Sequence, residues 1–400
     1  DFVAVVGLRT VSRHAATANL PLLVLMLTAA FGAFASVVAS SVDHGQVAAS
    51  YLQVGADFRL EEIGIGGLPP SLDPTTIPGV EAVAPGVVDG TAGLATGTGR
   101  RATVDFDAVD TAAYATVTAG TAAQPAWPSA FLEPPTGDGI GTDANPIPAI
   151  LSAQLPPGIS SLNPGDTFTI GVAQQSLTFR LVQKQDAFPG HGNGTIFAIV
   201  PLDWVRAAVP GQSFVPTVLW LRASNEATAP LAAMVGAASE GVRIVSRQDA
   251  YAALHDAPLG SAVADFFGVA LDVAVLYMAV TLVGAVLMSA AGRTRDLAYL
   301  RTLGVSGRQA QALTAVENAP PVLVALVPGV LLGVGVAILV EPGLGLADFV
   351  GAQGVPLFVD WPKLGLVIVI LSAVVAVAIG AGTWLSGRAR LVNALRIEDS

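Results

Sequence analysis

The sequence predicts a membrane α-helical protein with four transmembrane helices and a large α+β extracytoplasmic domain between the first and the second of them. The first observation is compositional: only 12% of the 400 residues are charged and 52% are apolar, with a mean hydropathy of +0.64. Soluble globular domains carry about 25% charged residues. The second observation is that charges are missing from four long stretches, and the third is that a long charged segment separates the first two of these stretches.

The four stretches without Asp, Glu, Lys or Arg are long enough to cross a membrane. About 20 apolar helical residues span roughly 30 Å of hydrocarbon. A buried helix of a soluble protein is the alternative, but such helices are usually shorter. The stretches are residues 15–42, 273–292, 319–340 and 364–387. We therefore expect spans at residues 20–42, 265–292, 316–340 and 364–387.

Basic residues near the spans predict the orientation, because they accumulate on the cytoplasmic side. They precede the first span, separate the second from the third, and follow the fourth: Arg9, Arg13, Arg293, Arg295, Arg301, Arg308, Arg388, Arg390 and Arg396. We therefore expect three cytoplasmic segments, residues 1–19, 293–315 and 388–400. Residues 43–264 and the short 341–363 loop are expected outside.

The outer segment has the pattern of a mixed α and β domain. Alternating apolar residues predict strands at 56–63, 101–106, 167–172, 177–183, 195–200, 217–222 and 242–245. Helices are expected at 202–209 and 230–240, and a single helix at 247–267 that runs into the second span. Residues 119–148 are rich in Pro, Gly and Thr, so we expect a junction between two lobes near 119–165.

Several kinds of chemistry have no motif in this sequence. The formal net charge of −11 argues against nucleic-acid binding, and the absence of cysteine excludes thiolate sites. No phosphate-binding loop ends in Lys-Ser or Lys-Thr, so we expect no ATP hydrolysis by this chain. The histidines are scattered, so we expect no metal site and no catalytic site. His191 lies in a Pro-Gly-rich run that predicts an exposed turn.

Polar residues within the predicted spans are candidate functional residues, because a charge at membrane depth is costly. Asp272 lies near the outer end of the second span, and Glu317 and Asn318 lie at the start of the third. A structural role is favoured for each of them, as an interfacial anchor or a water-exposed group. A proton or ion pathway is the alternative.

The segment between the second and third spans predicts a short helix at the cytoplasmic membrane surface. Leucines recur on one face, Gly304 can end the helix, and Ser306 can cap the next one. An ordinary amphipathic connector is the alternative. The candidate coupling residues are Arg293, Arg295, Leu300, Arg301, Leu303, Gly304, Ser306 and Arg308.

This segment resembles the signature of the FtsX-like permeases, the membrane subunits of the MacB/FtsX class of type VII ABC transporters. The resemblance rests on Leu300-Arg301-Thr302-Leu303-Gly304-Val305-Ser306, followed by Glu317. The layout of one span, a large outer domain and three further spans is also similar. Gly55-Ala56-Asp57 after the first span, and Pro78-Gly79-Val80 before a strand, resemble the MacB-type outer domain.

The resemblance implies a permease subunit, or half of one, that couples ATP hydrolysis by two cytosolic ABC ATPases to movement of the outer domain. ATP and Mg²⁺ would bind the partner ATPases, and no cofactor is expected in this chain. A second permease copy or half, membrane lipid and an outer lipoprotein or hydrolase are the other expected partners. The implied location is the plasma membrane of a bacterium. An actinobacterial source is part of the same expectation, because many similar permeases of actinobacteria carry two copies of this unit in one polypeptide, of which this chain would be one.

The expected substrate is hydrophobic: a lipid, lipoprotein, peptide or drug that is exported or extracted. The alternative is a transmembrane signalling or scaffold protein, FtsX-like in form, that switches an outer partner such as a cell-wall hydrolase without transport. A membrane-bound enzyme is a third possibility, for which the sequence supplies no catalytic constellation.

Overall fold

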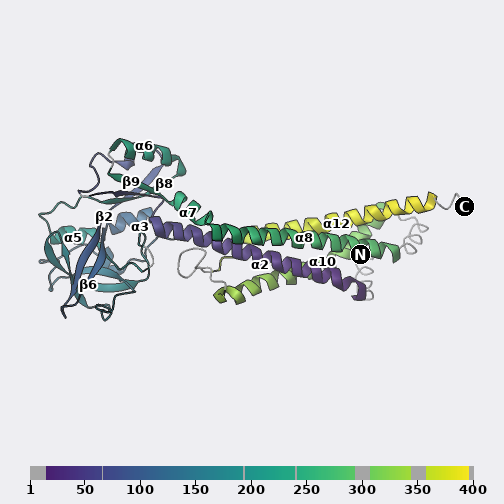
Figure 1. Cartoon of the computed structure of the whole chain (residues 1–400), viewed down its shortest axis with the longest axis horizontal. Helices are drawn as coiled ribbons and strands as arrows, with labels where there is room; N and C mark the ends of the chain where they lie inside the picture. Colours follow the sequence, from purple (N-terminus) through teal and green to yellow (C-terminus); the bar gives the residue numbers. More distant parts are fainter. Residues whose placement is uncertain are drawn as a thin grey trace. The chain divides into compact units, whose positions relative to one another are not determined.

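The computed structural model describes residues 15–64, 66–191, 194–238, 241–292, 307–343 and 357–395. It divides into two compact units (Figure 1). The helical unit comprises Asp1–Gly45 and Ala257–Ser400, and the outer unit comprises Gln46–Asp256. The division therefore falls inside one long helix and again just before another.

Long helices form the helical unit. They are α2 (Ala15–Val54), α8 (Pro258–Gly292), α10 (Gly307–Val340) and α12 (Trp361–Leu395), with a short 3-10 turn, η3 (Glu341–Gly343), after α10. Each of the four predicted spans lies within one of these helices. Among the described residues, one helix, over Leu22–Val54, has the length and apolar composition needed to cross a membrane, while Val324–Val340 and Trp361–Val377 are shorter apolar helices.

Small residues allow α10 to approach α2 closely. A side chain added at Gly329 would place its Cβ 2.6 Å from the carbonyl oxygen of Met26, and one added at Gly333 would collide with the carbonyl oxygen of Ala30. The two glycines are four residues apart, the spacing with which small residues bring helix backbones together in membranes. Alanines on α2, including Ala29 and Ala33, complete the contact.

Apolar side chains cover much of the outward surface of the helical unit. Large examples on α8 are Phe266, Val269, Val273, Leu276, Tyr277 and Val280, and others project from α10 and α12. A soluble protein rarely exposes such a continuous apolar surface. The distribution fits helices whose outer faces contact lipid.

The outer unit is built on one nine-stranded sheet within the described residues, in the order β3-β7-β4-β6-β5-β2-β8-β1-β9. An additional β2–β3 pairing closes the first six of these strands into a ring. The strands are β1 (Phe58–Glu62), β2 (Val80–Thr96), β3 (Arg101–Val109), β4 (Ile147–Ser152), β5 (Thr167–Val172), β6 (Gln175–Gln185), β7 (Phe197–Pro201), β8 (Val218–Ala223) and β9 (Val242–Ser246).

Short helices cover this sheet. They are η1 (Pro74–Thr76), α3 (Thr111–Val117), α4 (Ser129–Leu132), α5 (Leu202–Ala208), η2 (Asn225–Ala227), α6 (Thr228–Ala238) and α7 (Arg247–His255). The six-stranded ring encloses one hydrophobic core, which includes Phe106, Phe168 and Phe179. A separate core, which includes Leu60 and Leu231, lies between the β8-β1-β9 region and α6.

The strands predicted from alternation are confirmed with small shifts of their ends, and so are the helices at α5 and α6. The single helix predicted for residues 247–267 is wrong: α7 ends at His255 and α8 begins at Pro258. Proline lacks the N–H that a continuing helix needs, but it is well tolerated in the first turn of a new helix. The chain therefore breaks at Asp256 and Ala257.

The close contact between α2 and α10 predicts that a larger side chain on α10 lowers the stability of the protein only at positions that face α2. We expect Gly333→Val to destabilise the purified full chain by about 1–3 kcal/mol, because the added side chain collides with the α2 backbone. Gly335→Val is the matched control, since a Cβ at Gly335 meets no atom within 4 Å. Thermal unfolding in detergent measures the difference, and equal unfolding temperatures for the two variants would contradict the contact.

Candidate functional site

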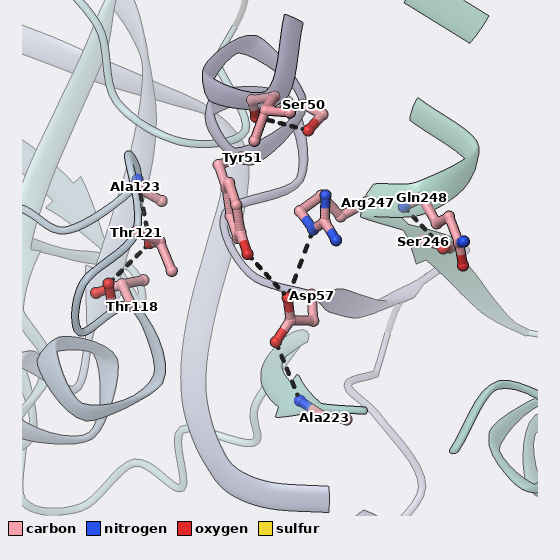
Figure 2. Close-up of polar contacts among 11 residues, drawn as sticks. Ser50, Tyr51, Asp57, Thr118, Thr121, Ala123, Ala223, Ser246, Arg247 and Gln248 are labelled. Atoms are coloured by element: carbon pink, nitrogen blue, oxygen red, sulfur yellow. Dashed lines mark hydrogen bonds and ion pairs between the residues drawn. The ribbon is translucent and has the colours of Figure 1, made fainter. Parts of the chain in front are cut away.

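A polar junction centred on Asp57 lies where α2 ends and β1 begins (Figure 2). Asp57 Oδ1 accepts a hydrogen bond from the hydroxyl of Tyr51 at 3.2 Å, and Oδ2 accepts one from the amide of Ala223 at 3.2 Å. The Asp57 amide donates to the carbonyl oxygen of Leu221 at 3.1 Å. One aspartate thus joins the last turn of α2 to strand β8.

The same aspartate holds the start of α7. The amide of Arg247 donates to the carbonyl oxygen of Asp57 at 2.9 Å, and Arg247 Nε lies 3.5 Å from Asp57 Oδ1. The guanidinium also lies over the ring of Tyr51, 4.7 Å from its centroid. Ser246 caps α7 by accepting from the amide of Gln248 at 3.1 Å. Asp57 therefore holds the first residue of α7, the helix that precedes α8.

The contacts of this junction hold segments of the chain together, which is a structural role. The side chains of Asp57 and Arg247 are each 23% exposed. Among the described residues, the Arg247 Nε–H has no hydrogen-bond acceptor. The pair with Asp57 is therefore a charge contact, and the amide and hydroxyl donors supply the directional bonds. Hydrogen bonds to a charged group contribute about 1.5–3 kcal/mol, and partial exposure reduces the value of the ion pair.

Gly55 shapes the end of α2 beside this junction. Its φ of 92° is the left-handed conformation that commonly ends helices. Its amide donates to the carbonyl oxygen of Tyr51 at 2.7 Å, and its own carbonyl oxygen accepts from the buried hydroxyl of Tyr114 at 3.1 Å. A Cβ at this position would lie 2.7 Å from Trp220 Nε1. The exit of the chain from α2 is therefore fixed against buried aromatic rings.

Another set of polar contacts ties α2 to the segment just before α12, within the helical unit. The amide of Phe358 donates to Ser41 Oγ at 2.9 Å, and the Phe358 ring stacks on His44 at a centroid distance of 4.3 Å. Lys363 Nζ lies 3.2 Å from Asp43 Oδ2 and 3.6 Å from Asp360 Oδ2. These contacts join α2 to the N-terminal end of α12.

Most of the predicted coupling residues lie outside the described residues. These are Arg293, Arg295, Leu300, Arg301, Leu303, Gly304 and Ser306. Arg308 lies in the first turn of α10, which begins directly after Ser306, and Glu317 and Asn318 lie further along the same helix. Asp272 lies on α8 with an exposed side chain.

Sequence reasoning missed the roles of Tyr51, Asp57 and Arg247. The available signal was Gly55-Ala56-Asp57 directly after an apolar stretch, a helix stop followed by an acid. The expectation that His191 lies in an exposed turn is wrong, because its side chain is only 7% exposed. It contacts Asp105 and Asp107 on β3, which are distant in sequence and gave no local signal. In the part of the chain that the structure describes, no group of three acidic or histidine side chains is arranged to hold a metal ion.

Comparison with known proteins gives one family match. Residues 268–391 match the family model described as FtsX-like permease C-terminal. No match was found among curated proteins.

Two solved structures are similar to parts of the chain. One is the extracellular domain of the noncanonic ABC-type transporter YknZ from Gram-positive bacteria, with 11% identity and a TM-score of 0.29, covering 47% of this chain and 99% of that one. The other is the periplasmic region of MacB from Actinobacillus actinomycetemcomitans, with 13% identity and a TM-score of 0.30, covering 52% of this chain and 96% of that one.

The Asp57 junction predicts a local loosening when its carboxylate is removed. In Asp57→Ala, we expect amide exchange to accelerate by about tenfold or more in peptides covering Ala223 and α7, because a lost hydrogen bond to a charged group costs about 1.5–3 kcal/mol. Hydrogen-exchange mass spectrometry of the full chain measures this. Asp138→Ala removes an exposed aspartate elsewhere in the outer unit and is the control. Unchanged exchange in Asp57→Ala would show that other contacts hold α7.

Proposed function

We propose that this chain is a permease subunit of an ABC transporter that transmits ATP-driven movement from the cytoplasmic side of a membrane to its outer unit. The match of residues 268–391 to the FtsX-like permease C-terminal family supports the assignment as a permease. The observation that carries the proposal is a continuous path of contacts. α10 begins at Gly307 and packs its backbone on α2 at Gly329 and Gly333. α2 then ends at Gly55, directly before the Asp57 junction.

The input to this path is the segment 293–308. Leu300 and Leu303 are proposed to fill apolar pockets on a cytosolic ATPase, while Arg293, Arg295, Arg301 and Arg308 face acidic groups or phospholipid. An apolar anchor surrounded by charged residues gives an interface both affinity and register. Gly304 and Ser306 are proposed to end this helix and to start the next one, so that a displacement of the segment would act directly on α10, which begins at Gly307.

The partners follow from this arrangement. Two ABC ATPase subunits, which bind ATP and Mg²⁺, would act on two permease copies or halves. This chain supplies no nucleotide site in the proposal. The outer unit would act on or with an extracytoplasmic partner such as a lipoprotein or hydrolase, and Asp272, Glu317 and Asn318 are proposed as structural polar groups within the helices.

The proposed substrate is hydrophobic: a lipid, lipoprotein, peptide or amphiphilic drug that is exported or extracted from the membrane. The support is the exposed apolar surface of α8, α10 and α12, along which such a molecule can remain in an apolar environment. The proposed location is a bacterial plasma membrane, with the two chain ends in the cytoplasm and the outer unit on the opposite side.

The input segment is tested by a charge placed on its apolar face. Leu303→Asp is expected to reduce recovery of the ATPase with the permease at least tenfold, because burying a leucine contributes about 1.5–3 kcal/mol and a buried carboxylate adds a further cost. Co-purification from membranes at equal permease abundance measures this. Thr302→Asp introduces the same charge beside the predicted face and should retain the ATPase. Unchanged recovery in Leu303→Asp would contradict the coupling assignment.

The proposed topology is tested by labelling introduced cysteines, which is unambiguous because the chain has no native cysteine. Gly97→Cys lies in the outer unit at a position where a Cβ meets nothing within 4 Å, and it should react with a membrane-impermeant maleimide in intact cells. Thr302→Cys should react only after the membrane is opened. The reverse pattern of labelling would overturn the orientation.

A further inference from the structure

His191 lies between two carboxylates that it contacts with opposite edges of its ring. Its Nε2 lies 2.5 Å from Asp107 Oδ2, and its Nδ1 lies 3.6 Å from Asp105 Oδ2. A neutral imidazole carries a proton on only one ring nitrogen, whereas the imidazolium ion carries one on each. Protonated His191 therefore presents a donor to both carboxylates, while neutral His191 leaves a lone pair facing one of them.

The surroundings of His191 make the proton important for charge balance. The side chain of Asp107 is 3% exposed, and its second oxygen has no hydrogen-bond partner among the described residues. Arg59, from β1, opposes the histidine charge, and Tyr114, from α3, is a neutral buried phenol. The guanidinium of Arg59 is itself paired with Glu61, at 3.0 Å. A proton on His191 offsets the excess negative charge.

The segment that carries His191 also touches the end of α2. The amide of Gly190 donates to the carbonyl oxygen of Leu52 at 2.8 Å, in the last turn of that helix. Phe188 is fully buried against Tyr114 and Phe197, with ring centroids 5.9 and 6.2 Å away. The His191 ring itself lies 5.2 Å from the ring of Phe197. The segment is thus anchored on the ring of strands at one side and on α2 at the other.

We propose that His191 is a proton-dependent latch: the imidazolium ion between Asp105 and Asp107 fixes the segment 186–191 against the last turn of α2, and loss of the proton loosens that grip. The latch makes the contact between the segment 186–191 and the last turn of α2, both within the outer unit, depend on the surrounding pH. Its consequence for coupling rests on the proposed function, but its existence does not.

The direction of the pH effect follows from the electrostatics. Burial favours the neutral ring, but the hydrogen bond and charge of Asp107 and the charge of Asp105 outweigh burial and the opposing Arg59, so the pKa of His191 is raised. Burial and the neighbouring Asp107 also raise the pKa of Asp105, despite the opposing effect of His191. A raised histidine pKa contributes stability that is complete below the unfolded-state value of about 6.5 and is lost as the pH rises through the folded-state value.

The test is hydrogen exchange of the segment 186–191 in the purified full chain at pH 5.5 and pH 8.5, after correction for intrinsic exchange rates. We expect protection of the Gly190 amide to fall with rising pH, by about tenfold for each unit by which the folded-state pKa exceeds its reference. The β5–β6 hairpin, Thr167–Gln185, is the internal control and should show no such change. Equal protection at both pH values in the wild type would overturn the latch.

Two variants make the test specific. His191→Gln still donates to Asp107 but cannot be charged, so its protection should be independent of pH. A pH dependence that persists in His191→Gln would assign the effect to another group and reject the proposal. Asp105→Asn removes one partner charge at a position that is 30% exposed, so the fall in protection between pH 5.5 and pH 8.5 should be smaller than in the wild type. A fall in protection as large in Asp105→Asn as in the wild type would also contradict the proposal.

The latch and the proposed function can fail independently. The exchange measurement uses neither ATP nor an ATPase, whereas recovery of the ATPase with Leu303→Asp is measured at one fixed pH. Loss of the pH dependence with normal ATPase binding would reject the latch alone, and an intact pH dependence without ATPase binding would reject the coupling assignment alone.

Discussion

The carboxylate of Asp57 brings three separated parts of the chain to one point: the last turn of α2, strand β8 and the start of α7. The outer unit is entered through α2 and left through α7, so this single side chain fixes both ends of the domain at one place. Gly55, with its positive φ and its contact with Trp220, makes that geometry possible by ending α2 directly before the aspartate.

Local patterns predicted those elements whose residues alternate regularly, and they failed where the signal was not local. β5 is an example of success, since Thr167–Val172 alternates in both sequence and burial. β2 lacks a clear pattern because Pro85, Gly86, Gly90 and Gly93 interrupt it, and β4 is buried along its full length and so has no alternation. The helix break before Pro258 could have been predicted, because proline is unfavourable within a helix.

The candidate site was harder to predict than the fold. Its partners come from distant segments, as with Asp57 and Ala223 or His191 and Asp107, and spacing along one chain gives no indication of such pairs. The helix contact at Gly329 and Gly333 did have a local signal, the four-residue spacing of two glycines. That spacing does not identify the partner helix, which the structure shows to be α2 with its alanines. The assignment of residues 293–306 to the coupling segment rests on the sequence alone, because these residues lie outside the described ones.

Strand β2 belongs to two parts of the sheet at once. Residues 80–86 of β2 pair with β8, residues 86–95 pair with β3, and residues 94–96 pair with β5. The pairing with β3 contains a register shift between Asp89 and Ala92. A force on β8 therefore crosses one set of hydrogen bonds to reach β2, and the covalent backbone of β2 then carries it to the pairings with β3 and β5. In the sheet, separating the β8-β1-β9 strands from the six-stranded ring would require the whole β2–β8 ladder to break, a higher barrier than the extension of a connecting loop.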